Sequence, residues 1–464
     1  MENLRVSSYL IDTKLENTDQ HMLIHGYTGA MDIVKDELAT YLSSTSGFFS
    51  KEDLPCSDAT ANLLEERGYI TQKTQEEEYA YVERLATALH RKDRILNACF
   101  TFLITYNCNF RCPYCFEKDA VHDLMRQKVF TKEMVDKAYE AIMKIEPREQ
   151  LRVKTIDLYG GEPLLKENKE IISYIVQKGK DLGFKFRATT NGYDLDFFED
   201  LLSPYLIFNL QITIDGIKDI HNQKRIHYEG FPTFDRIVSN IGIALKKNVQ
   251  VLVRVNTDKN NFNSLLPLTE MFDNLHYTNN KYFKIDSALL RNNDKYFDKN
   301  SDYFTQREFF NAHQKLKFRY GCQSFGVYTK VYDAITKQKP LHLKATSCGS
   351  QVNGFIFDPF GKIYPCWEMV GKEAFQIGDY NSEDIKWNNS VLKKWRDKNI
   401  LTLNSCRYCK YALLCGGGCA ARNLETLEYC TNMSVVLNYV VNLAFRNVQN
   451  KYFTNLKNSG GNNL

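Results

Sequence analysis

The stretch Cys108-Asn109-Phe110-Arg111-Cys112-Pro113-Tyr114-Cys115 decides how this chain is interpreted. Its cysteines have the spacing C-x3-C-x2-C and follow an apolar run at 102–105 that is typical of a strand. Three thiolates on a short loop can ligate three irons of a [4Fe–4S] cluster, which leaves the fourth iron free to bind a substrate or cofactor. The alternatives are a zinc site or cysteines buried in a core, but structural zinc sites use four ligands.

The composition is that of an ordinary globular protein. The 464 residues are 43% hydrophobic and 25% charged, with a formal net charge of +4, and this length predicts about three domains. The small charge gives no indication of nucleic-acid or membrane binding, and no apolar run is long enough to span a membrane. The first residues lack the pattern of a signal peptide, so we expect a cytoplasmic protein. The 13 cysteines then indicate metal or redox chemistry rather than disulfides.

Residues 1–95 are predicted to form a small domain of their own. The expected elements are strands at 6–11, 21–25, 31–34 and 68–70, helices at 36–42 and 58–66, and a helical connector at 76–96. This order resembles a winged helix, and in particular the leader-peptide recognition element at the front of many peptide-modifying enzymes. Such an element binds an extended peptide at the edge of its sheet. The alternative is a packing domain without a ligand.

Residues 96–320 are predicted to alternate between strands and helices. The expected strands lie at 102–105, 155–159, 184–189, 208–214, 249–255 and 282–287, and helices separate them, for example at 132–145, 169–182 and 234–247. Six such units predict an α/β fold with a parallel sheet covered by helices. With the cysteine loop after the first strand, they resemble the partial (β/α)6 barrel of the radical S-adenosylmethionine (radical SAM) superfamily. Function in such barrels lies at the carboxyl ends of the strands.

The resemblance implies that Cys108, Cys112 and Cys115 are the catalytic cluster ligands. In the superfamily the open iron binds the amino and carboxylate groups of SAM, and electron transfer into the sulfonium releases a 5′-deoxyadenosyl radical. The residues that the resemblance places around SAM are Tyr114, Gly160, Gly161, Glu162, Asn191, Thr213, Asp215, Arg225 and Arg254.

Three short motifs carry these assignments. Gly160-Gly161-Glu162-Pro163 resembles the GGEP motif, in which the glycines allow close backbone approach and the segment binds the SAM amino group. Thr190-Asn191-Gly192 resembles the TNG motif, although it is also typical of a simple turn. Thr213-Ile214-Asp215-Gly216, followed by His221 and Arg225, resembles a stretch whose hydroxyl and arginine bind the SAM carboxylate.

The remaining polar residues of these segments receive weaker assignments. We interpret His221 as structural, and we expect Arg254, at the end of the fifth strand, to reach the nucleoside. Tyr114 and Phe116 are expected to pack on the adenine or in the core. Glu117 is expected to be a solvated or lid residue rather than an acid catalyst.

A second set of cysteines predicts further clusters within residues 321–464. Its members are Cys348, Cys366, Cys406, Cys409, Cys415, Cys419 and Cys430. The set resembles the SPASM domain, which carries auxiliary iron–sulfur clusters, and a zinc module is the alternative. The resemblance implies an outer [4Fe–4S] cluster on Cys406, Cys409, Cys415 and Cys430, so that the chain holds three clusters in all.

The inner cluster would then have Cys348, Cys366 and Cys419, one ligand fewer than full cysteine ligation requires. Either Cys322 supplies the fourth ligand, or an iron stays open for a substrate thiolate. We expect the open iron.

The pattern as a whole is similar to that of thioether-forming maturases of Cys-rich ribosomal peptides. It implies a precursor peptide whose leader binds the N-terminal domain, hydrogen abstraction from the peptide, a cross-link such as a thioether, and a flavodoxin- or ferredoxin-type reductant. The inner auxiliary cluster would accept the second electron. Anaerobic sulfatase maturases share the barrel but carry an Asp base directly after the cysteine that Cys366 matches, where this chain has Trp367 and then Glu368. The alternatives are therefore a sulfatase-maturase-like oxidation of a protein Cys or Ser side chain, and a non-catalytic iron–sulfur or zinc protein.

Overall fold

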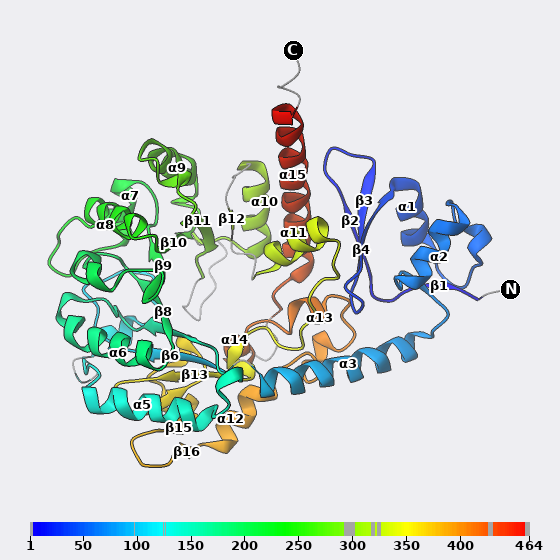
Figure 1. The fold of residues 1–464 in the computed structure, drawn as a ribbon. Helices are drawn as coiled ribbons and strands as arrows, with labels where there is room; N and C mark the ends of the chain where they lie inside the picture. The colour runs from blue at the N-terminus through cyan, green and yellow to red at the C-terminus, as the bar shows by residue number, and fades with distance from the viewer. Residues whose placement is uncertain are drawn as a thin grey trace. The chain divides into compact units, whose positions relative to one another are not determined.

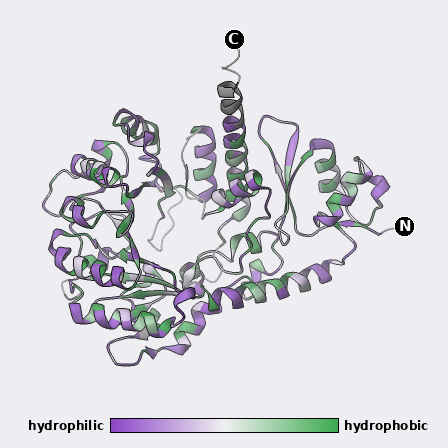
Figure 2. Ribbon diagram, viewed as in Figure 1, coloured by the Kyte–Doolittle hydropathy of each residue, from purple (hydrophilic) through white to green (hydrophobic). Residues whose placement is uncertain are grey.

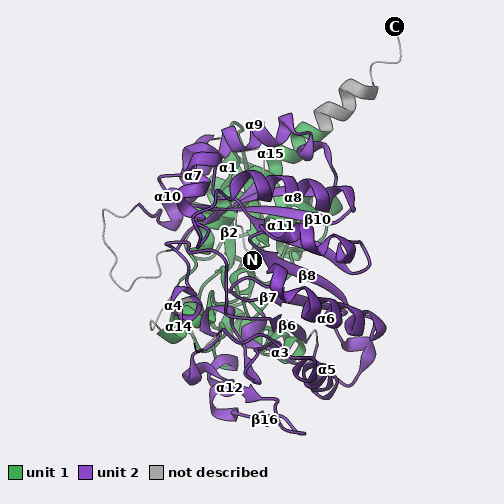
Figure 3. Cartoon of the chain, turned by 90° about the vertical axis from the view of Figure 1, so that its left-hand side faces the viewer, with its two compact units in different colours: residues 1–93, 324–348, 397–464 green, residues 94–323, 349–396 purple. Residues whose placement is uncertain are grey.

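The computed structural model describes residues 3–96, 98–123, 125, 127–291, 302–316, 321–322, 326–425 and 430–459. The chain divides into two compact units, which Figure 3 shows in different colours. Unit 1 contains residues 1–93, 324–348 and 397–464, and unit 2 contains residues 94–323 and 349–396. The three domains expected from the sequence remain a prediction.

Unit 2 is built on one long sheet. Over the described residues its order is β12-β11-β10-β9-β8-β7-β6-β13-β14-β15-β16. Neighbours from β12 to β13 are parallel, and those from β13 to β16 are antiparallel. The strands are β6 (Cys99–Leu103), β7 (Thr155–Tyr159), β8 (Lys185–Thr190), β9 (Ile207–Thr213), β10 (Gln250–Thr257), β11 (Phe283–Leu289), β12 (Gly321–Cys322), β13 (Gly354–Phe357), β14 (Lys362–Tyr364), β15 (Gly378–Asp379) and β16 (Lys386–Trp387).

Helices connect most of the parallel strands, and those between β7 and β11 lie on the outer side of the sheet in Figure 1. They are α4 (Lys118–His122), α5 (Lys132–Ile145), α6 (Lys169–Asp181), α7 (Lys218–Lys224), α8 (Phe234–Lys246), α9 (Leu265–Asn274), α10 (Gln306–Leu316) and α12 (Asn389–Arg396). Figure 2 shows hydrophobic and hydrophilic positions in alternation along them. On α5, for example, Val135, Ala138 and Ile142 share one face at helical spacing and are buried. The predicted α/β fold is confirmed.

The sheet extends beyond the six predicted strands at both ends. β13 and β14 form a hairpin, with Asp358 accepting the amides of Phe360 and Lys362 in the turn. Its first strand adds in parallel to β6, so that β6 is not a sheet edge. The rings of Phe100 and Phe355 stack across this pair with centroids 6.1 Å apart. Because this pairing joins residues about 250 positions apart, local pattern did not predict it.

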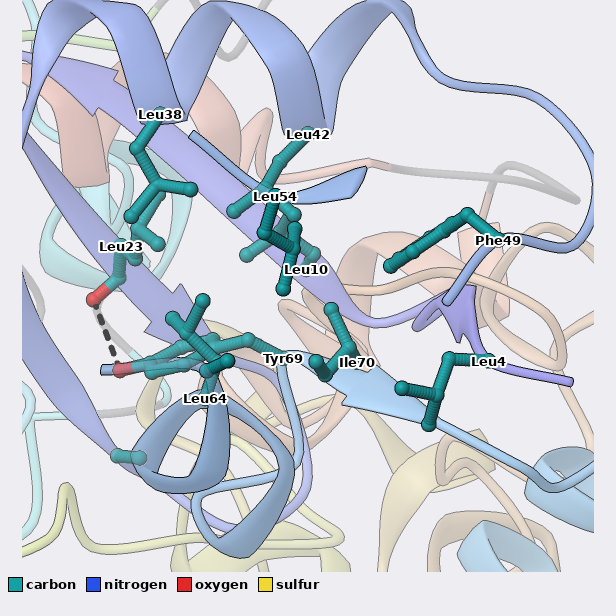
Figure 4. Packing of buried hydrophobic residues seen from close by; sticks show 12 residues of the cluster. Leu4, Leu10, Leu23, Leu38, Leu42, Phe49, Leu54, Leu64, Tyr69 and Ile70 are labelled. Atoms are coloured by element: carbon teal, nitrogen blue, oxygen red, sulfur yellow. Dashed lines mark hydrogen bonds between the residues drawn. The ribbon is translucent and has the colours of Figure 1, made fainter. Parts of the chain in front are cut away.

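The front of unit 1 contains a three-stranded antiparallel sheet in the order β2-β3-β4. Its strands and the neighbouring elements are β1 (Arg5–Val6), β2 (Leu10–Lys14), β3 (Gln20–His25), β4 (Met31–Lys35), α1 (Asp36–Ser44), α2 (Asp58–Glu66) and β5 (Ile70–Thr71). Figure 4 shows the core between them, in which the Tyr69 hydroxyl donates to the Leu23 carbonyl at 3.2 Å. The predicted strand at 6–11 is split, because the Leu10 amide closes a turn onto the Ser7 carbonyl at 3.1 Å.

The rest of unit 1 is mostly helical. Its helices are α3 (Gln75–Ile95), whose last residues fall in unit 2, α11 (Val327–Lys337), α13 (Ala412–Cys415), α14 (Ala420–Glu425) and α15 (Met433–Ser459). A second core joins the front of the unit to its carboxyl-terminal part through Tyr9, Val82, Ile400 and Leu413. In the described part of the chain, no helix has the length and apolar character needed to cross a membrane.

Candidate active site

The cysteine loop follows β6 and is held at both ends by backbone hydrogen bonds. The Gly161 amide donates to the Thr105 carbonyl at 2.9 Å, and the Glu162 amide donates to the Asn107 carbonyl at 2.8 Å. Farther along the loop, the Arg111 amide donates to Ile226 at 2.7 Å and the Tyr228 amide donates to Asn109 at 2.9 Å. The loop is therefore fixed between the β7 end and the segment after α7.

The two glycines of the GGEP motif are required by this close approach. A Cβ on Gly161 would lie 2.4 Å from the carbonyl oxygens of both Tyr106 and Asn107. A Cβ on Gly160, which has φ +150°, would lie 2.4 Å from the Thr105 carbonyl oxygen. In this structure the glycines let β7 approach the cysteine loop itself.

The thiols of Cys108, Cys112 and Cys115 lie close enough to act on one another. Burial raises the pKa of the Cys108 thiol, and Glu162 and the other two thiols raise it further. Burial and Glu117 raise the pKa of Cys115 to about 12. Thiols this buried require a metal or a cation to become thiolates.

The donor set fits an iron–sulfur cluster better than a single metal ion. Within the described residues, no three His, Cys, Asp or Glu side chains are placed to hold one ion. The ligands of a cubane cluster each bind a different iron, so they surround a volume instead of converging on a point. A guanidinium also faces the set, since Arg225 hydrogen-bonds the Cys112 sulfur and favours its thiolate.

Glu162 is buried at the ends of β7 and β8. Its carboxylate accepts the Leu164 amide at 2.8 Å, the Thr190 hydroxyl at 2.6 Å and the Asn191 amide at 2.6 Å. Burial raises the pKa of Glu162 to about 7, and these three donors work against that rise. A carboxylate has about four acceptor sites, so one site is left for a cation. The role of Glu162 toward SAM remains a prediction.

Asn191 lies beside Glu162 and points back to the cysteine loop. Its side-chain amide donates to the Asn109 side chain at 2.7 Å, and Asn109 in turn donates to Asp194 at 3.4 Å. The TNG segment therefore stabilises the cysteine loop through this hydrogen bond. Its contact with SAM stays a prediction.

A second polar network joins the loop to β9 and β10. The Tyr114 hydroxyl donates to the Asp215 carboxylate and accepts from Arg225 at 3.3 Å. The Asn256 amide donates to Asp215 at 2.9 Å, and the Arg254 guanidinium donates to the Asn256 side chain at 3.0 Å. Four of the five residues in this network were predicted from the sequence to contact SAM. The fifth, Asn256, lies on β10 two residues after Arg254.

Arg225 keeps an unused donor in this network. Its Nε is buried and has no hydrogen-bond partner among the described residues. Buried donors are rarely left unpaired in native proteins, so an acceptor that the chain does not provide is expected here. Thr213, buried beside Arg254 in the β9–β10 register, completes the predicted set at this edge.

His221 has the structural role expected of it. Its ring is fully buried, and Nδ1 accepts the Asp215 amide at 3.3 Å. Burial, together with the nearby Arg225, lowers the pKa of His221 to about 3. The ring is therefore neutral and supports the turn that carries Asp215.

Of the alternatives expected for Glu117, a solvated position is wrong, and its role as a lid residue stays a prediction. This residue is only 8% exposed, and burial raises the pKa of its carboxyl to about 8. Its Oε1 has no hydrogen-bond partner in the described part of the chain. Glu117 acts electrostatically on Tyr159, the last residue of β7, and on Tyr106, which follows β6. Its burial depends on these distant residues, and no local pattern indicated it.

Trp367 also lies at the site. The sequence indicated this residue only through the contrast with sulfatase maturases, which carry an Asp at this position. Its ring packs edge-on against Tyr159, with centroids 4.6 Å apart. Glu368 forms an ion pair with Arg291 at 3.5 Å. Cys366, directly before them, acts electrostatically on Tyr159. The hairpin thus brings its cysteine to the carboxyl ends of the barrel strands.

A cavity of about 440 Å³ lies on another side of the cysteine loop. Cys108, Arg111, Tyr193, His227 and Arg236 are among its lining residues. The residues predicted to contact SAM are not among those that line this cavity.

Four of the carboxyl-terminal cysteines form a group in unit 1. Cys415, Cys409 and Cys430 each act on Cys406, and burial raises the pKa of the Cys406 thiol to about 11. Cys430 also acts on Cys409 and Cys415. The four cysteines are thus near one another, and their assignment to an outer cluster stays a prediction. The inner set stays a prediction, because Cys348 and Cys419 belong to unit 1 and Cys366 to unit 2.

The comparisons with known proteins agree with this geometry. Residues 102–261 match the sequence profile of the radical SAM superfamily. A cysteine-type anaerobic sulfatase-maturating enzyme of Clostridium novyi is 24% identical over 340 residues, which cover 69% of this chain and 86% of that enzyme. Residues 102–261 therefore form a radical SAM domain, and the chain is similar in sequence to the sulfatase maturases. This domain implies SAM and a [4Fe–4S] cluster.

Two solved structures share the fold. The structure of anSMEcpe with bound AdoMet has a TM-score of 0.54 at 16% identity and covers 76% of this chain and 98% of that one. Streptococcus suis SuiB bound to precursor peptide SuiA has a TM-score of 0.50 at 12% identity and covers 92% of this chain and 97% of that one.

Proposed function

We propose that this chain is a maturase that modifies a ribosomally made precursor peptide. The observation that carries the proposal is an open sheet edge in unit 1, on strand β4. The share of this chain that each solved structure matches supports the proposal. anSMEcpe matches over 98% of its own length but covers only 76% of this chain. Peptide-bound SuiB covers 92% of this chain. A sulfatase maturase therefore leaves about a quarter of this chain without a counterpart.

The two edges of the β2-β3-β4 sheet are covered to different extents. On β2, the Leu10 carbonyl accepts from the Lys410 ammonium at 3.0 Å and the Lys14 carbonyl accepts from Asn442 at 3.2 Å, so this edge is covered. On β4, the His25 amide bonds the Ala30 carbonyl at 2.9 Å. Ladder alternation then points the backbone groups of Ile33 away from β3. The Met31 carbonyl of β4 accepts from the Arg67 guanidinium at 3.1 Å, so the available part of this edge is at Ile33.

The outer edge of β4 is suited to peptide binding by strand addition. The Ile33 side chain is 43% exposed, and no described strand pairs with this edge. An extended leader segment would satisfy the open backbone groups, and its side chains would provide the specificity.

In the barrel, the proposed roles follow the geometry of the site. Cys108, Cys112 and Cys115 hold the cluster, while Glu162, Thr213 and Arg225 hold SAM. The bound cofactors supply a carbon radical by reductive cleavage of the sulfonium. The protein orients the peptide and excludes water, with the Tyr159 and Trp367 rings beside the cysteine loop.

The proposal further includes cofactors and partners that this chain would need. The outer cysteines Cys406, Cys409, Cys415 and Cys430 hold one auxiliary [4Fe–4S] cluster, and Cys348, Cys366 and Cys419 hold a second one with an open iron. The reductant is a flavodoxin- or ferredoxin-type protein. The product is a peptide with a cross-link such as a thioether.

Co-expression with a short Cys-rich peptide encoded beside this chain's gene tests the proposal. A thioether cross-link removes two hydrogen atoms and keeps the sulfur, and it joins two residues that stay connected after proteolysis. The expected result is this mass change, and its dependence on SAM. SAM cleavage without any change in such a peptide would contradict the proposal.

The edge itself is tested by Ile33→Pro, with Ile33→Val as the matched control. Proline removes an outward N–H and leaves the bonds to β3 in place. We expect peptide affinity to fall about tenfold, because one or two backbone hydrogen bonds are lost. SAM cleavage without peptide should not change. Equal peptide affinities for the two variants would exclude docking on β4.

Sulfatase-maturase-like oxidation of a Cys or Ser side chain is the second candidate, favoured by the 24% identity to the Clostridium novyi enzyme. That chemistry alters one side chain and leaves no cross-link. The position after Cys366 carries the Trp367 ring, and the Glu368 carboxylate is paired with Arg291. Since no free carboxylate follows this cysteine, the geometry favours the peptide maturase.

A further inference from the structure

Lys344 is a half-buried lysine in unit 1 whose ammonium lies close to two cysteines of the carboxyl-terminal set. It acts electrostatically on Cys415 and Cys348. No carboxylate among the described residues forms an ion pair with it. The one charged side chain of the same sign that acts on it in the described part of the chain is Lys330 on α11, which itself interacts with Asp93. A lysine in this setting lacks the carboxylate partner that buried ammonium groups usually have.

The backbone fixes Lys344 beside Cys415. Its amide donates to the Leu413 carbonyl at 2.8 Å, and Leu413 lies on α13, which ends at Cys415. Gly416 directly follows Cys415, and a Cβ on Gly416 would lie 2.3 Å from the carbonyl of Thr346, two residues after Lys344. The segment 344–347 and the segment 413–418 are thus in direct backbone contact, and this contact fixes the main chain of Lys344 beside the segment that carries Cys415.

Cys415 itself faces several positive groups. Its sulfur accepts hydrogen bonds from the amides of Gly417 and Gly418, which have φ +83° and +74°. Successive amides in such a conformation form an anion-binding concavity. Burial raises the pKa of the Cys415 thiol, and the Lys344 ammonium together with these amides opposes that rise.

We propose that Lys344 is the counter-charge of the iron–sulfur cluster held by Cys406, Cys409, Cys415 and Cys430, and that it raises the reduction potential of this cluster. The inference rests on the proposed cluster at these cysteines. A [4Fe–4S] cluster with four thiolates is an anion that gains one negative charge when it accepts one electron. A fixed ammonium stabilises the reduced form more than the oxidised form, and amide hydrogen bonds to sulfur act in the same direction.

The role in the reaction follows from this potential. When a radical on a peptide couples to sulfur and a closed-shell product forms, one electron is left over. The inner auxiliary cluster accepts it first, and an outer cluster with a raised potential can then take it from the inner one. Lys344 is then a positioning residue that acts through the cluster and does not touch the substrate.

The test is a redox titration with dithionite, followed by EPR, on the reconstituted full-length chain. Cys108, Cys112 and Cys115 are replaced by alanine, so that only carboxyl-terminal clusters contribute. The signal that Cys406→Ala abolishes belongs to the outer cluster. If the chain with all seven carboxyl-terminal cysteines gives no such signal, the proposed cluster is absent, and this result is distinct from a failure of Lys344.

For Lys344→Gln we expect the ratio of reduced to oxidised outer cluster at a fixed potential to fall about tenfold, since one unit charge is removed at short range. A tenfold change corresponds to a potential lower by about 59 mV for one electron. Lys344→Arg keeps the charge and should titrate like the parent. Lys337→Gln is the matched control, because Lys337 is an exposed lysine of α11 paired with Asp333 at 3.0 Å.

An unchanged potential in Lys344→Gln, or an equal fall in Lys344→Arg, would overturn the inference. If Lys344→Gln does not retain iron, Lys330→Gln replaces it, since Lys330 is the cation that acts on Lys344. This variant should lower the potential by a smaller amount, and no shift would overturn the inference as well.

Discussion

Two buried carboxylates, Glu78 of α3 in unit 1 and Asp215 after β9 in unit 2, differ in how completely they are hydrogen-bonded. Glu78 has a donor for nearly every acceptor site. The donors are Arg5 at 2.5 Å, the Ser7 hydroxyl at 2.5 Å, the Ser8 amide at 2.9 Å and the Tyr27 hydroxyl at 3.1 Å. Burial acts to raise the pKa of Glu78, but these donors outweigh it and the pKa is lowered.

Asp215 belongs to a network that is not complete. It accepts from Tyr114 and from the Asn256 amide, while Arg225 nearby keeps a buried Nε without a partner among the described residues. Burial raises the pKa of Asp215, and its partners reverse the rise only in part. The difference teaches that a saturated network holds the fold, whereas a network with a spare donor is preorganised for a ligand.

The largest expected effect is on the saturated network. Glu78→Ala leaves the Arg5 guanidinium and two hydroxyls without their acceptor, so we expect the free energy of unfolding of unit 1 to fall by about 3–5 kcal/mol. Urea denaturation followed by circular dichroism measures this change. The control is Glu76→Ala, since Glu76 is an exposed residue of α3 two positions before Glu78. A change below 1 kcal/mol would show that the network is not saturated in solution.

His25 extends this network and makes its stability depend on pH. Its Nε2 bonds the Ser7 hydroxyl at 2.9 Å and its Nδ1 accepts the Thr28 amide at 3.2 Å, so the neutral ring is fully used. Burial lowers the pKa of His25 to about 4. The unfolded state therefore binds a proton first as the pH falls, and stability that is present above about pH 6.5 is lost between pH 6.5 and 4.

The expected loss over this window is about 3 kcal/mol, at 1.36 kcal/mol for each pKa unit. Comparison with His25→Gln isolates the effect from that of the carboxylates. The variant should be less stable at pH 7 and should show a smaller loss between pH 6.5 and 4. Parallel pH profiles for the two proteins would contradict the assignment.

The sequence predicted more of the incomplete network than of the complete one. The motif around Asp215 and Arg225 is local, and so is the glycine pair at Gly160 and Gly161. Strand and helix positions followed from periodicity and are largely confirmed. Glu78, by contrast, was read only as part of a charged helix, because its donors at 5–27 lie about 50 to 70 residues away.

The same reason explains the errors at the site. Glu117 is buried through Tyr106 and Tyr159, and the hairpin after 354 pairs with β6. Such contacts depend on which strands become neighbours, and hydropathy along a segment contains no information on that. The Lys344 environment was missed because a lone lysine in a loop has no pattern until the fold places it beside Cys415.

The backbone that carries the incomplete network is tested by Gly161→Ala. The added Cβ would meet two carbonyl oxygens of the cysteine loop at 2.4 Å, and neither can move without shifting the loop. We expect the rate of reductive SAM cleavage to fall about 100-fold, because a misplacement of 1 Å at a reacting centre has roughly this effect. Anaerobic assay of 5′-deoxyadenosine measures it.

The control for this variant is Gly230→Ala. Gly230 has φ +79°, but a Cβ there meets nothing within 4 Å. It costs only the strain of a left-handed residue, about 1 kcal/mol. If the two variants cleave SAM equally well, the close approach of β7 to the loop does not matter for the reaction.

The smallest expected effect sharpens the comparison most, because it separates binding from stability. Arg225→Lys keeps the charge near Asp215 and Cys112 but removes Nε and the planar fork, which suits a carboxylate. Since Nε makes no bond to the described chain, the free energy of unfolding should change by less than about 1 kcal/mol. SAM affinity of the anaerobically reconstituted protein should fall about 30-fold, the equivalent of one lost charge-assisted bond of about 2 kcal/mol.

The matched control is Arg187→Lys on β8. Arg187 pairs with Asp157 at 2.7 Å, and this variant should leave SAM affinity unchanged. A variant at Arg225 that loses stability but binds SAM normally would mean that the spare donor belongs to the fold, and the distinction between the two networks would fail.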